Sequence, residues 1–193
     1  RIITKSLSII LLFFSISLLS ILISFDALDQ GWGIISERPT TNIYSEIGAW
    51  FSGLIIREFG IFPGLLLSLV LFIWSLKLFN NSVITYVKTK LFAIFFMIFM
   101  SSLGASYIET ILVKTFNLNS PIISQRGLSE WLLSNFSNVI SKISGFDITT
   151  SEFIIGISFF VLFLILFTWI LSLNSCETKL MKFVIRPLLM LLI

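Results

Sequence analysis

The 193-residue chain contains no histidine and a single cysteine, Cys176. Histidine-based acid–base catalysis, histidine-ligated metal sites and an internal disulfide framework are therefore excluded within it. Three enzyme patterns are missing as well: the phosphate-binding loop G-x-x-x-x-G-K-[ST], the serine elbow G-x-S-x-G, and paired carboxylates beside a cleft. We therefore predict that this chain is not an enzyme and holds no cofactor.

Charge is also scarce. Charged residues make up 12% of the chain and hydrophobic residues 56%, with a mean hydropathy of +1.04. A typical soluble domain is about 25% charged. The basic residues form no stripe with interleaved aromatics, so nothing indicates direct contact with nucleic acid. This composition is typical of a membrane protein.

Four stretches carry no charge for about 18 residues or more: Leu7–Phe25, Phe59–Leu76, Leu91–Ile108 and Phe153–Cys176. A helix of about 20 apolar residues covers the hydrocarbon core of a bilayer, which is about 30 Å thick. We therefore predict an all-α, polytopic membrane protein with four transmembrane helices and additional interfacial amphipathic helices. The expected spans are about 7–25, 59–79, 91–113 and 153–174, in a single domain covering residues 1–193.

The distribution of charge predicts the orientation. With the N-terminus inside the cell, the inner segments carry eight Lys and Arg residues and the outer segments, 26–58 and 114–152, carry five. This asymmetry favours an N-in, C-in topology by the positive-inside rule. Tryptophans are expected at the two interfaces, with Trp74 and Trp169 near the inner ends and Trp32, Trp50 and Trp131 on the outer side.

Two amphipathic segments lie on the predicted outer side. Ile43–Phe59 reads as a short helix, and a straight continuation to Phe79 would be about 55 Å long. We therefore predict a bend before the second span, at Gly60, Pro63 and Gly64. Leu128–Ile143 has apolar residues at helical spacing, which predicts a helix in the outer interface.

Small residues gather in two places and predict close helix packing, because lipid supplies no hydrophobic drive between helices. These residues are Gly48, Ala49 and Gly53 before the bend, and Ser101, Ser102, Gly104, Ala105 and Ser106 in the third span. Charged residues at membrane depth suggest function by default. Arg57, Glu58 and Glu109 fall near the outer helix ends, so we interpret them as interface and packing residues.

Several loop strings resemble the N-terminal four-helix membrane domain of the FtsK/SpoIIIE DNA translocases. Leu22–Asp29, followed by Gly31-Trp32, is similar to that family's L-x-S-[FY]-x-x-x-D-x-[SG]-[WF] exit from the first helix. Asn42, Gly48-Ala49-Trp50 and Phe59-Gly60 are similar to its N-x-x-G-x-x-G-A…F-G signature, with Ser45 replacing the first glycine. Further similar strings are Gly127-Leu128 with Leu132–Ser134, and Leu166–Thr168. The second outer segment is longer and more polar than the family pattern.

The resemblance implies a role. Such a domain anchors a cytoplasmic ring-shaped DNA motor to the bacterial inner membrane at the division septum, helps it oligomerise, and contacts other septal membrane proteins. ATP, Mg²⁺ and DNA would be bound by a C-terminal motor domain outside this chain. Because the chain starts at Arg1 and stops within an apolar stretch, we expect it to be a piece of a larger protein.

A small transporter or channel subunit of the inner membrane is the alternative. Such a protein would show internal repeats, broken helices in corresponding positions and polar groups at mid-membrane depth. Of these features only the predicted bend at Gly60–Gly64 is present, and it has no counterpart elsewhere in the sequence.

Overall fold

The computed structural model describes residues 2–35, 37–82, 84–116, 127–145 and 147–171. For residues 106–116, 127, 129, 130, 149 and 150 it describes only the backbone. Within these ranges the secondary structure is helical apart from one isolated β-bridge between Gly31 and Ile34. The helices are α1 (Ile2–Ile23), α2 (Ser45–Glu58), α3 (Ile61–Phe79), α4 (Val87–Phe116), α5 (Gly127–Ser144) and α6 (Ile148–Ile170).

Four of these helices are long and apolar enough to cross a membrane. They are α1, α3, the Val87–Ala105 part of α4 and the Ser151–Ile170 part of α6. The predicted all-α fold with four membrane-spanning helices is therefore confirmed. The two remaining helices, α2 and α5, correspond to the two segments that the sequence predicts to be amphipathic.

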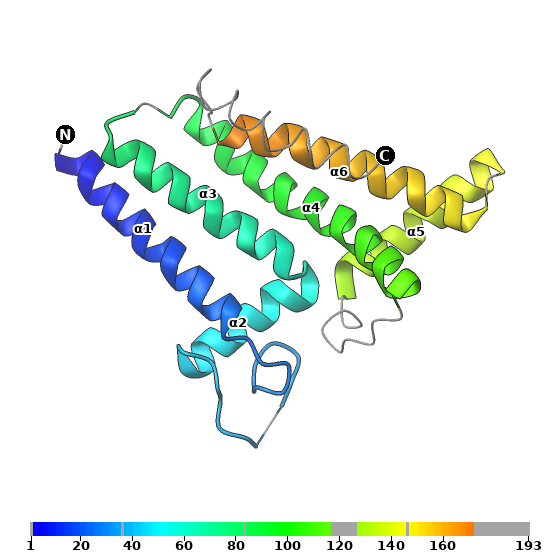
Figure 1. Cartoon of the computed structure of the whole chain (residues 1–193), viewed down its shortest axis with the longest axis horizontal. Coiled ribbons are helices and arrows are strands. Elements are labelled where there is room, and N and C mark those ends of the chain that lie inside the picture. The colour runs from blue at the N-terminus through cyan, green and yellow to red at the C-terminus, as the bar shows by residue number, and fades with distance from the viewer. Residues whose placement is uncertain (1, 36, 83, 117–126, 146, 172–193) are drawn as a thin grey trace.

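The four long helices lie side by side in the order α1, α3, α4, α6 (Figure 1). The most extensive packing is between α1 and α3 and between α4 and α6, and a smaller contact between α3 and α4 joins the two pairs. The larger contacts therefore join the first span to the second and the third span to the fourth. The short connection between α3 and α4 brings them together only over a smaller area.

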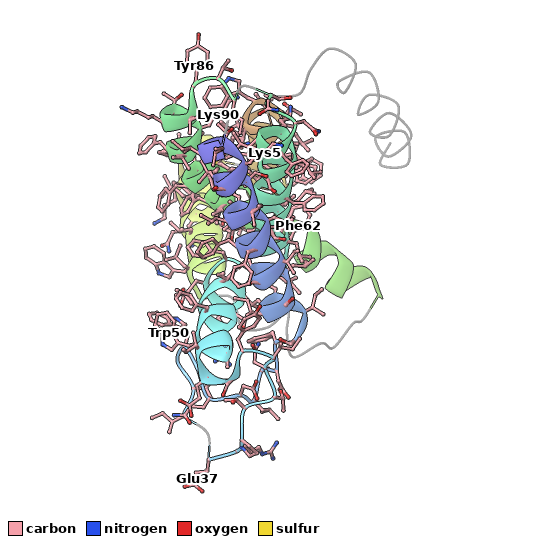
Figure 2. All side chains as sticks on the ribbon, turned by 90° about the vertical axis from the view of Figure 1, so that its left-hand side faces the viewer. Lys5, Glu37, Trp50, Phe62, Tyr86 and Lys90 are labelled. Atoms are coloured by element: carbon pink, nitrogen blue, oxygen red, sulfur yellow. The ribbon has the colours of Figure 1, made fainter. Side chains whose placement is uncertain are left out.

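The two ends of the helix row carry different residues (Figure 2). Lys5, Tyr86 and Lys90 lie at one end, which we call the near end; Glu37 and Trp50 lie at the other, the far end. The near end holds the starts of α1 and α4 and the ends of α3 and α6. Successive long helices therefore run in opposite directions, as four successive crossings of a membrane require.

Serine hydroxyls join α1 to α3. Ser15 Oγ donates to the carbonyl of Ser68 at 2.9 Å, and Ser75 Oγ donates to the carbonyl of Ser8, also at 2.9 Å. Ser68 Oγ donates a longer hydrogen bond, of 3.4 Å, to the carbonyl of Ser15. All four serines are buried. Small hydroxyl residues at seven-residue spacing on both helices bring the two backbones close and bond them directly.

The main hydrophobic core lies between α3, α4 and α6 and includes Val70, Trp74, Met97 and Phe163. Trp74 is only 4% exposed, and its Nε1 donates to the carbonyl of Ile170 at 3.0 Å. Trp74 lies near the end of α3, as predicted, but its side chain is buried in the bundle and does not face the membrane interface. Its indole bonds the end of α6 inside the bundle, because a buried indole N–H needs an acceptor.

Helix α5 crosses α4 and α6 in their far-end half (Figure 1). Leu133 packs with Leu103 of α4 and Ile155 of α6, and the rings of Phe136 and Phe159 lie 6.2 Å apart. The apolar residues of α5 thus divide into two groups. The first group packs on α4 and α6. The second group is exposed and available to lipid: Leu128, Trp131, Val139 and Ile143.

Candidate functional site

The polar contacts of the described residues concentrate at the far end, where α1 ends and α2 begins. We call this cluster the far-end node; it is built by Asp29, Thr41, Asn42, Tyr44 and Gly48. Among the described residues, no three His, Cys, Asp or Glu side chains gather as metal ligands would. The chemistry of the node is hydrogen bonding between a loop and two helix ends.

Asp29 is the acceptor at the centre of the node. Its carboxylate accepts the backbone N–H of Thr41 at 2.9 Å and that of Asn42 at 3.0 Å. The Thr41 hydroxyl lies 3.2 Å from both carboxylate oxygens. Asp29 is 5% exposed. A buried carboxylate is stable only when such donors surround it, so Asp29 ties the loop after α1 to the segment that leads into α2.

Asn42 connects the two helices directly. Its Nδ2 donates to the carbonyls of Ile21 at 3.0 Å and Ser24 at 3.3 Å, while its Oδ1 accepts the N–H of Tyr44 at 3.1 Å. The last carbonyls of a helix have no partner within the helix. The Asn42 amide supplies partners at the end of α1 and at the same time fixes the chain just before α2.

Two glycines allow this close approach. A Cβ atom on Gly48 would overlap Asn42 Oδ1 and lie 2.7 Å from Tyr44 Cβ. A Cβ atom on Gly31 would lie 2.8 Å from the carbonyl oxygen of Ala49. Any larger residue would displace the node or the loop. Asn42 and Gly48, two residues of the family-like string, are therefore in direct contact.

Aromatic residues hold another part of the loop against α2. Trp32 Nε1 donates to Glu58 Oε1 at 2.8 Å, and the rings of Trp32 and Trp50 meet edge to face at 5.3 Å. Gly53 lies beneath this pair, since a Cβ atom there would be 3.4 Å from the backbone nitrogen of Trp32. These contacts attach the loop to the outer side of α2 along its length.

Arg57 attaches the loop to the end of α2. Its Nη2 donates to the carbonyl of Ala27 at 2.9 Å, and its guanidinium lies 6.0 Å from the centre of the Phe25 ring. Its Nε is buried without a hydrogen-bond partner. Burial lowers the pKa of Arg57, but an arginine starts so high that the side chain stays charged. The contacts of Arg57 and of Glu58 serve to pack the loop on α2.

Between α2 and α3 the chain changes direction at Phe59 and Gly60. Gly60 has φ +94°, a conformation that glycine adopts without strain. Ser102 Oγ of α4 donates to the Phe59 carbonyl at 2.6 Å. Gly64 lies against both α1 and α2, because a Cβ atom there would be 2.9 Å from Leu22 Cδ1 and from Ile55 Cγ2. Pro63 is fully buried in the first turn of α3.

The small residues of α4 face helices of the same chain. A Cβ atom on Gly104 would lie 3.3 Å from the Cα of Phe160, which places α4 and α6 in close contact. Ser101, Ser102 and Ala105 are buried. The side chains of Ser106 and Glu109 lie outside the described residues, as do Cys176 and the segment around it. The described part of this patch packs α4 within the chain and leaves no free surface for a second copy.

Sequence reasoning missed the roles of Asp29 and Asn42. Both residues belong to the strings that carry the family resemblance, but the contact between the strings appears only in the structure. The α1–α3 serine contacts were missed as well. Their signal was the seven-residue spacing of Ser8 and Ser15 in the first span and of Ser68 and Ser75 in the second.

A protein-family model described as the 4TM region of DNA translocase FtsK/SpoIIIE matches residues 1–120 of the 193. The matched part contains the whole far-end node and helices α1 to α4. No curated protein and no solved structure matches the chain. The match covers more than half of the chain and includes the strings whose residues meet in the node. The chain belongs to the family of four-helix membrane regions of the FtsK/SpoIIIE DNA translocases.

Proposed function

We propose that this region anchors an ATP-driven DNA motor in the bacterial inner membrane and directs it to the division septum. The observation that carries the proposal is the family match over residues 1–120, which coincides with α1 to α4 and the node between them. Membrane anchoring is the coarse function of the family. Localisation to the septum, self-association and attachment to a motor domain are more specific roles, and we propose them for this chain.

The charges at the two ends of the helix row support a near end in the cytoplasm. Near the starts of α1 and α4 and the end of α3 lie Lys5, Lys77, Lys88 and Lys90, with no acidic side chain among the described residues there. The acidic residues of the described part, such as Asp26, Glu37 and Glu46, belong to the far end. The acidic residues weigh little in the positive-inside rule, but its count of Lys and Arg over the whole sequence, eight at the inner segments against five at the outer, favours an N-in orientation. That orientation would place a C-terminal motor in the cytoplasm with the DNA.

The node favours an anchoring role over catalysis. Asp29 and Asn42 are each 5% exposed, and their side-chain bonds go to neighbouring backbone groups. Buried groups satisfied in this way rigidify a structure and offer no reactive atom to a substrate. We infer that the node holds the far-end loop in one shape, which other septal membrane proteins would contact.

The transporter alternative gains no support from the helices. Transporters with broken helices place them in corresponding positions of two halves. Here each of the four helices that are long enough to cross a membrane is continuous over its spanning part, and the breaks lie before α3 and before α6. The serines between α1 and α3 bond to backbone carbonyls, so these hydroxyls serve helix packing.

The test compares three forms of the full-length protein, each with a fluorescent tag, in dividing cells. The natural protein is expected at the septum. Deletion of residues 1–193 should release it from the membrane. Replacement by an unrelated four-span, N-in, C-in region should restore membrane attachment but distribute the protein evenly around the cell. If the replacement form still accumulated at the septum, residues 1–193 would not be what directs the protein there.

A further inference from the structure

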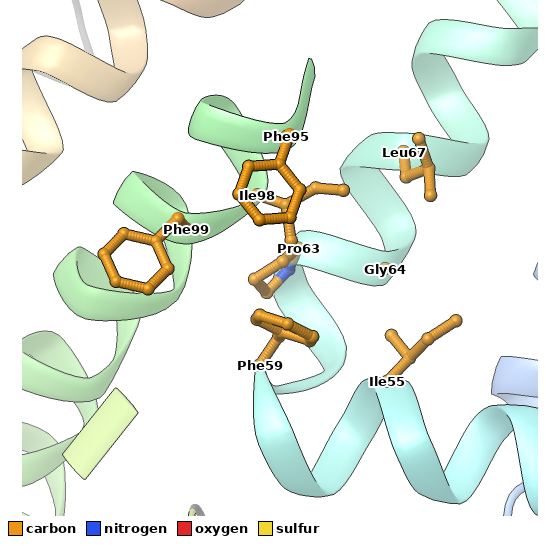
Figure 3. Close-up of a pocket in the computed structure, with 8 residues that line it drawn as sticks. All are labelled: Ile55, Phe59, Pro63, Gly64, Leu67, Phe95, Ile98 and Phe99. Carbon is orange, nitrogen blue, oxygen red and sulfur yellow. The ribbon is translucent and has the colours of Figure 1, made fainter. Parts of the chain in front are cut away.

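An apolar groove lies between α3 and α4 where α2 turns into α3 (Figure 3). Its volume is about 160 Å³. Side chains from both sides of the gap point into it in Figure 3. Phe59, Pro63 and Leu67 line one side, and Phe95, Ile98 and Phe99 of α4 line the other. The side chains that line the groove are all apolar, so it offers no side-chain partner to water or to a polar ligand.

The groove results from the way α2 and α3 meet α4. The bond from Ser102 Oγ to the Phe59 carbonyl holds the turn against α4. Beyond that turn the first turn of α3 contains Pro63, which is short, and Gly64, which has no side chain. The contact between α3 and α4 is also smaller than the contacts within the α1–α3 and α4–α6 pairs. The two helices therefore leave a gap that their own side chains do not fill.

The groove lies at the depth of lipid acyl chains. Phe95–Phe99 follow the start of α4 at Val87 by about 12–18 Å along the helix, at 1.5 Å per residue. Pro63–Leu67 precede the end of α3 at Phe79 by about 18–24 Å on the same measure. Both positions fall within a hydrocarbon core about 30 Å thick. At this depth neither water nor a lipid headgroup surrounds the protein.

The groove also opens on the lipid-facing surface. Phe95, which lines it, is 65% exposed, and its neighbours Phe92 and Phe96 are exposed as well. The space is therefore continuous with the surface that the membrane covers. An unfilled gap of this size deprives its walls of dispersion contacts. Apolar cavities of about 150 Å³ stay dry and take up apolar molecules such as benzene.

We propose that this groove is a binding site for one acyl chain of a membrane phospholipid. The depth of the groove, its apolar lining and its opening toward lipid together identify the occupant. At that depth the most concentrated molecules in a membrane are the flexible, apolar acyl chains of its lipids. A bound chain would fill the gap between the two helix pairs at the point where α2 turns into α3. This inference requires membrane insertion but not the proposed septal role.

The first test uses the purified protein in nanodiscs of phosphatidylethanolamine that contain a small fraction of the same lipid with a diazirine in its acyl chain. After illumination, lipid adducts are mapped by mass spectrometry. We expect adducts on Phe95, Phe99 and Leu67 to exceed those on Phe13, which is 65% exposed on α1 away from the groove. Equal labelling of Phe13 and the groove residues would overturn the proposal.

A variant that fills the groove tests the site, and the same substitution outside the groove is its matched control. Leu67→Phe should reduce adducts at Phe95 and Phe99 to the level at Phe13, whereas Leu69→Phe, on the same helix but 42% exposed, should leave them unchanged. Ile98→Phe repeats the test from the opposite wall if Leu67→Phe fails to fold. Unchanged adducts in both filling variants would overturn the site.

A photoreactive leucine at position 67 distinguishes a lipid from a second protein chain as the occupant. A mass increase equal to one phospholipid supports the proposal. Covalent dimers of the chain, with no lipid adduct, would show that a second copy inserts a side chain and would overturn it.

Discussion

Replacing Asp29 with alanine is expected to lower the free energy of unfolding by about 3 kcal/mol. The change leaves the backbone N–H groups of Thr41 and Asn42 without the acceptor that they contact at 2.9 and 3.0 Å. A buried donor without a partner costs about 1–3 kcal/mol, and two donors are affected. Unfolding by SDS titration in mixed micelles, followed by tryptophan fluorescence, measures the loss, because Trp32 of the loop and Trp50 of α2 pack on each other and should separate when the loop leaves α2.

Asp26→Ala is the matched control for this prediction. Asp26 lies in the same loop and accepts one backbone N–H, from Leu28 at 2.9 Å, but this bond is exposed. Water replaces an exposed acceptor, so the control should change stability by no more than about 0.5 kcal/mol. Equal losses in the two variants would mean that the node contributes nothing beyond an ordinary loop contact.

Ser15→Leu is the second change with a large expected effect, a loss of about 3 kcal/mol in the same titration. Ser15 is 3% exposed, and its hydroxyl contacts the backbone of α3 at Ser68. A leucine placed there forces α1 and α3 apart, and overpacking of this kind typically costs about 1–3 kcal/mol. The lost interhelical hydrogen bond adds about 0.6–1.7 kcal/mol.

Two further variants separate size from hydrogen bonding at this contact. Ser15→Ala removes the hydroxyl but keeps the close approach, so its loss should stay at about 1 kcal/mol. Ser6→Leu makes the same change on an exposed face of α1 and should be nearly neutral. If Ser15→Leu were as mild as Ser6→Leu, α1 would not pack on α3 through these serines.

The spans were predictable because length and apolar composition alone decide whether a helix can cross a bilayer. Their ends were less predictable. Helix α1 begins at Ile2, before Lys5, and α4 begins at Val87, before Lys88 and Lys90. A charged side chain at a helix end does not interrupt backbone hydrogen bonding, so the uncharged run underestimates the helix. The two amphipathic helices were visible from their periodicity, which does not depend on partners.

The pairing of the spans does not follow from their apolar composition. Apolar helix surfaces resemble one another, so composition does not show that α1 pairs with α3 and α4 with α6. Trp74 illustrates the same limit, because an indole near a helix end fits both an interface and a buried contact with Ile170. Which of the two it adopts depends on how α6 lies against α3, and that is a tertiary property.

The far-end node explains physically why separate strings carry the family resemblance. Asp29 lies in one string and Asn42 and Gly48 in another, and the three residues form one connected cluster. Asp29 must accept two backbone N–H groups, and Asn42 must bond both the end of α1 and Tyr44. Gly48 must have no side chain. A local reading of either string does not show this contact.

Accessibility of two engineered cysteines tests most directly whether the chain crosses the membrane as described. Cys176 is first replaced by serine, and Glu37→Cys and Ser82→Cys are then made separately, at exposed positions beyond opposite ends of α3. A membrane-impermeant maleimide should label the cysteine at position 37 in intact cells, and that at position 82 only after permeabilisation. Labelling of both positions in intact cells, or of neither, would contradict a membrane-crossing α3 and the four-span arrangement built on it.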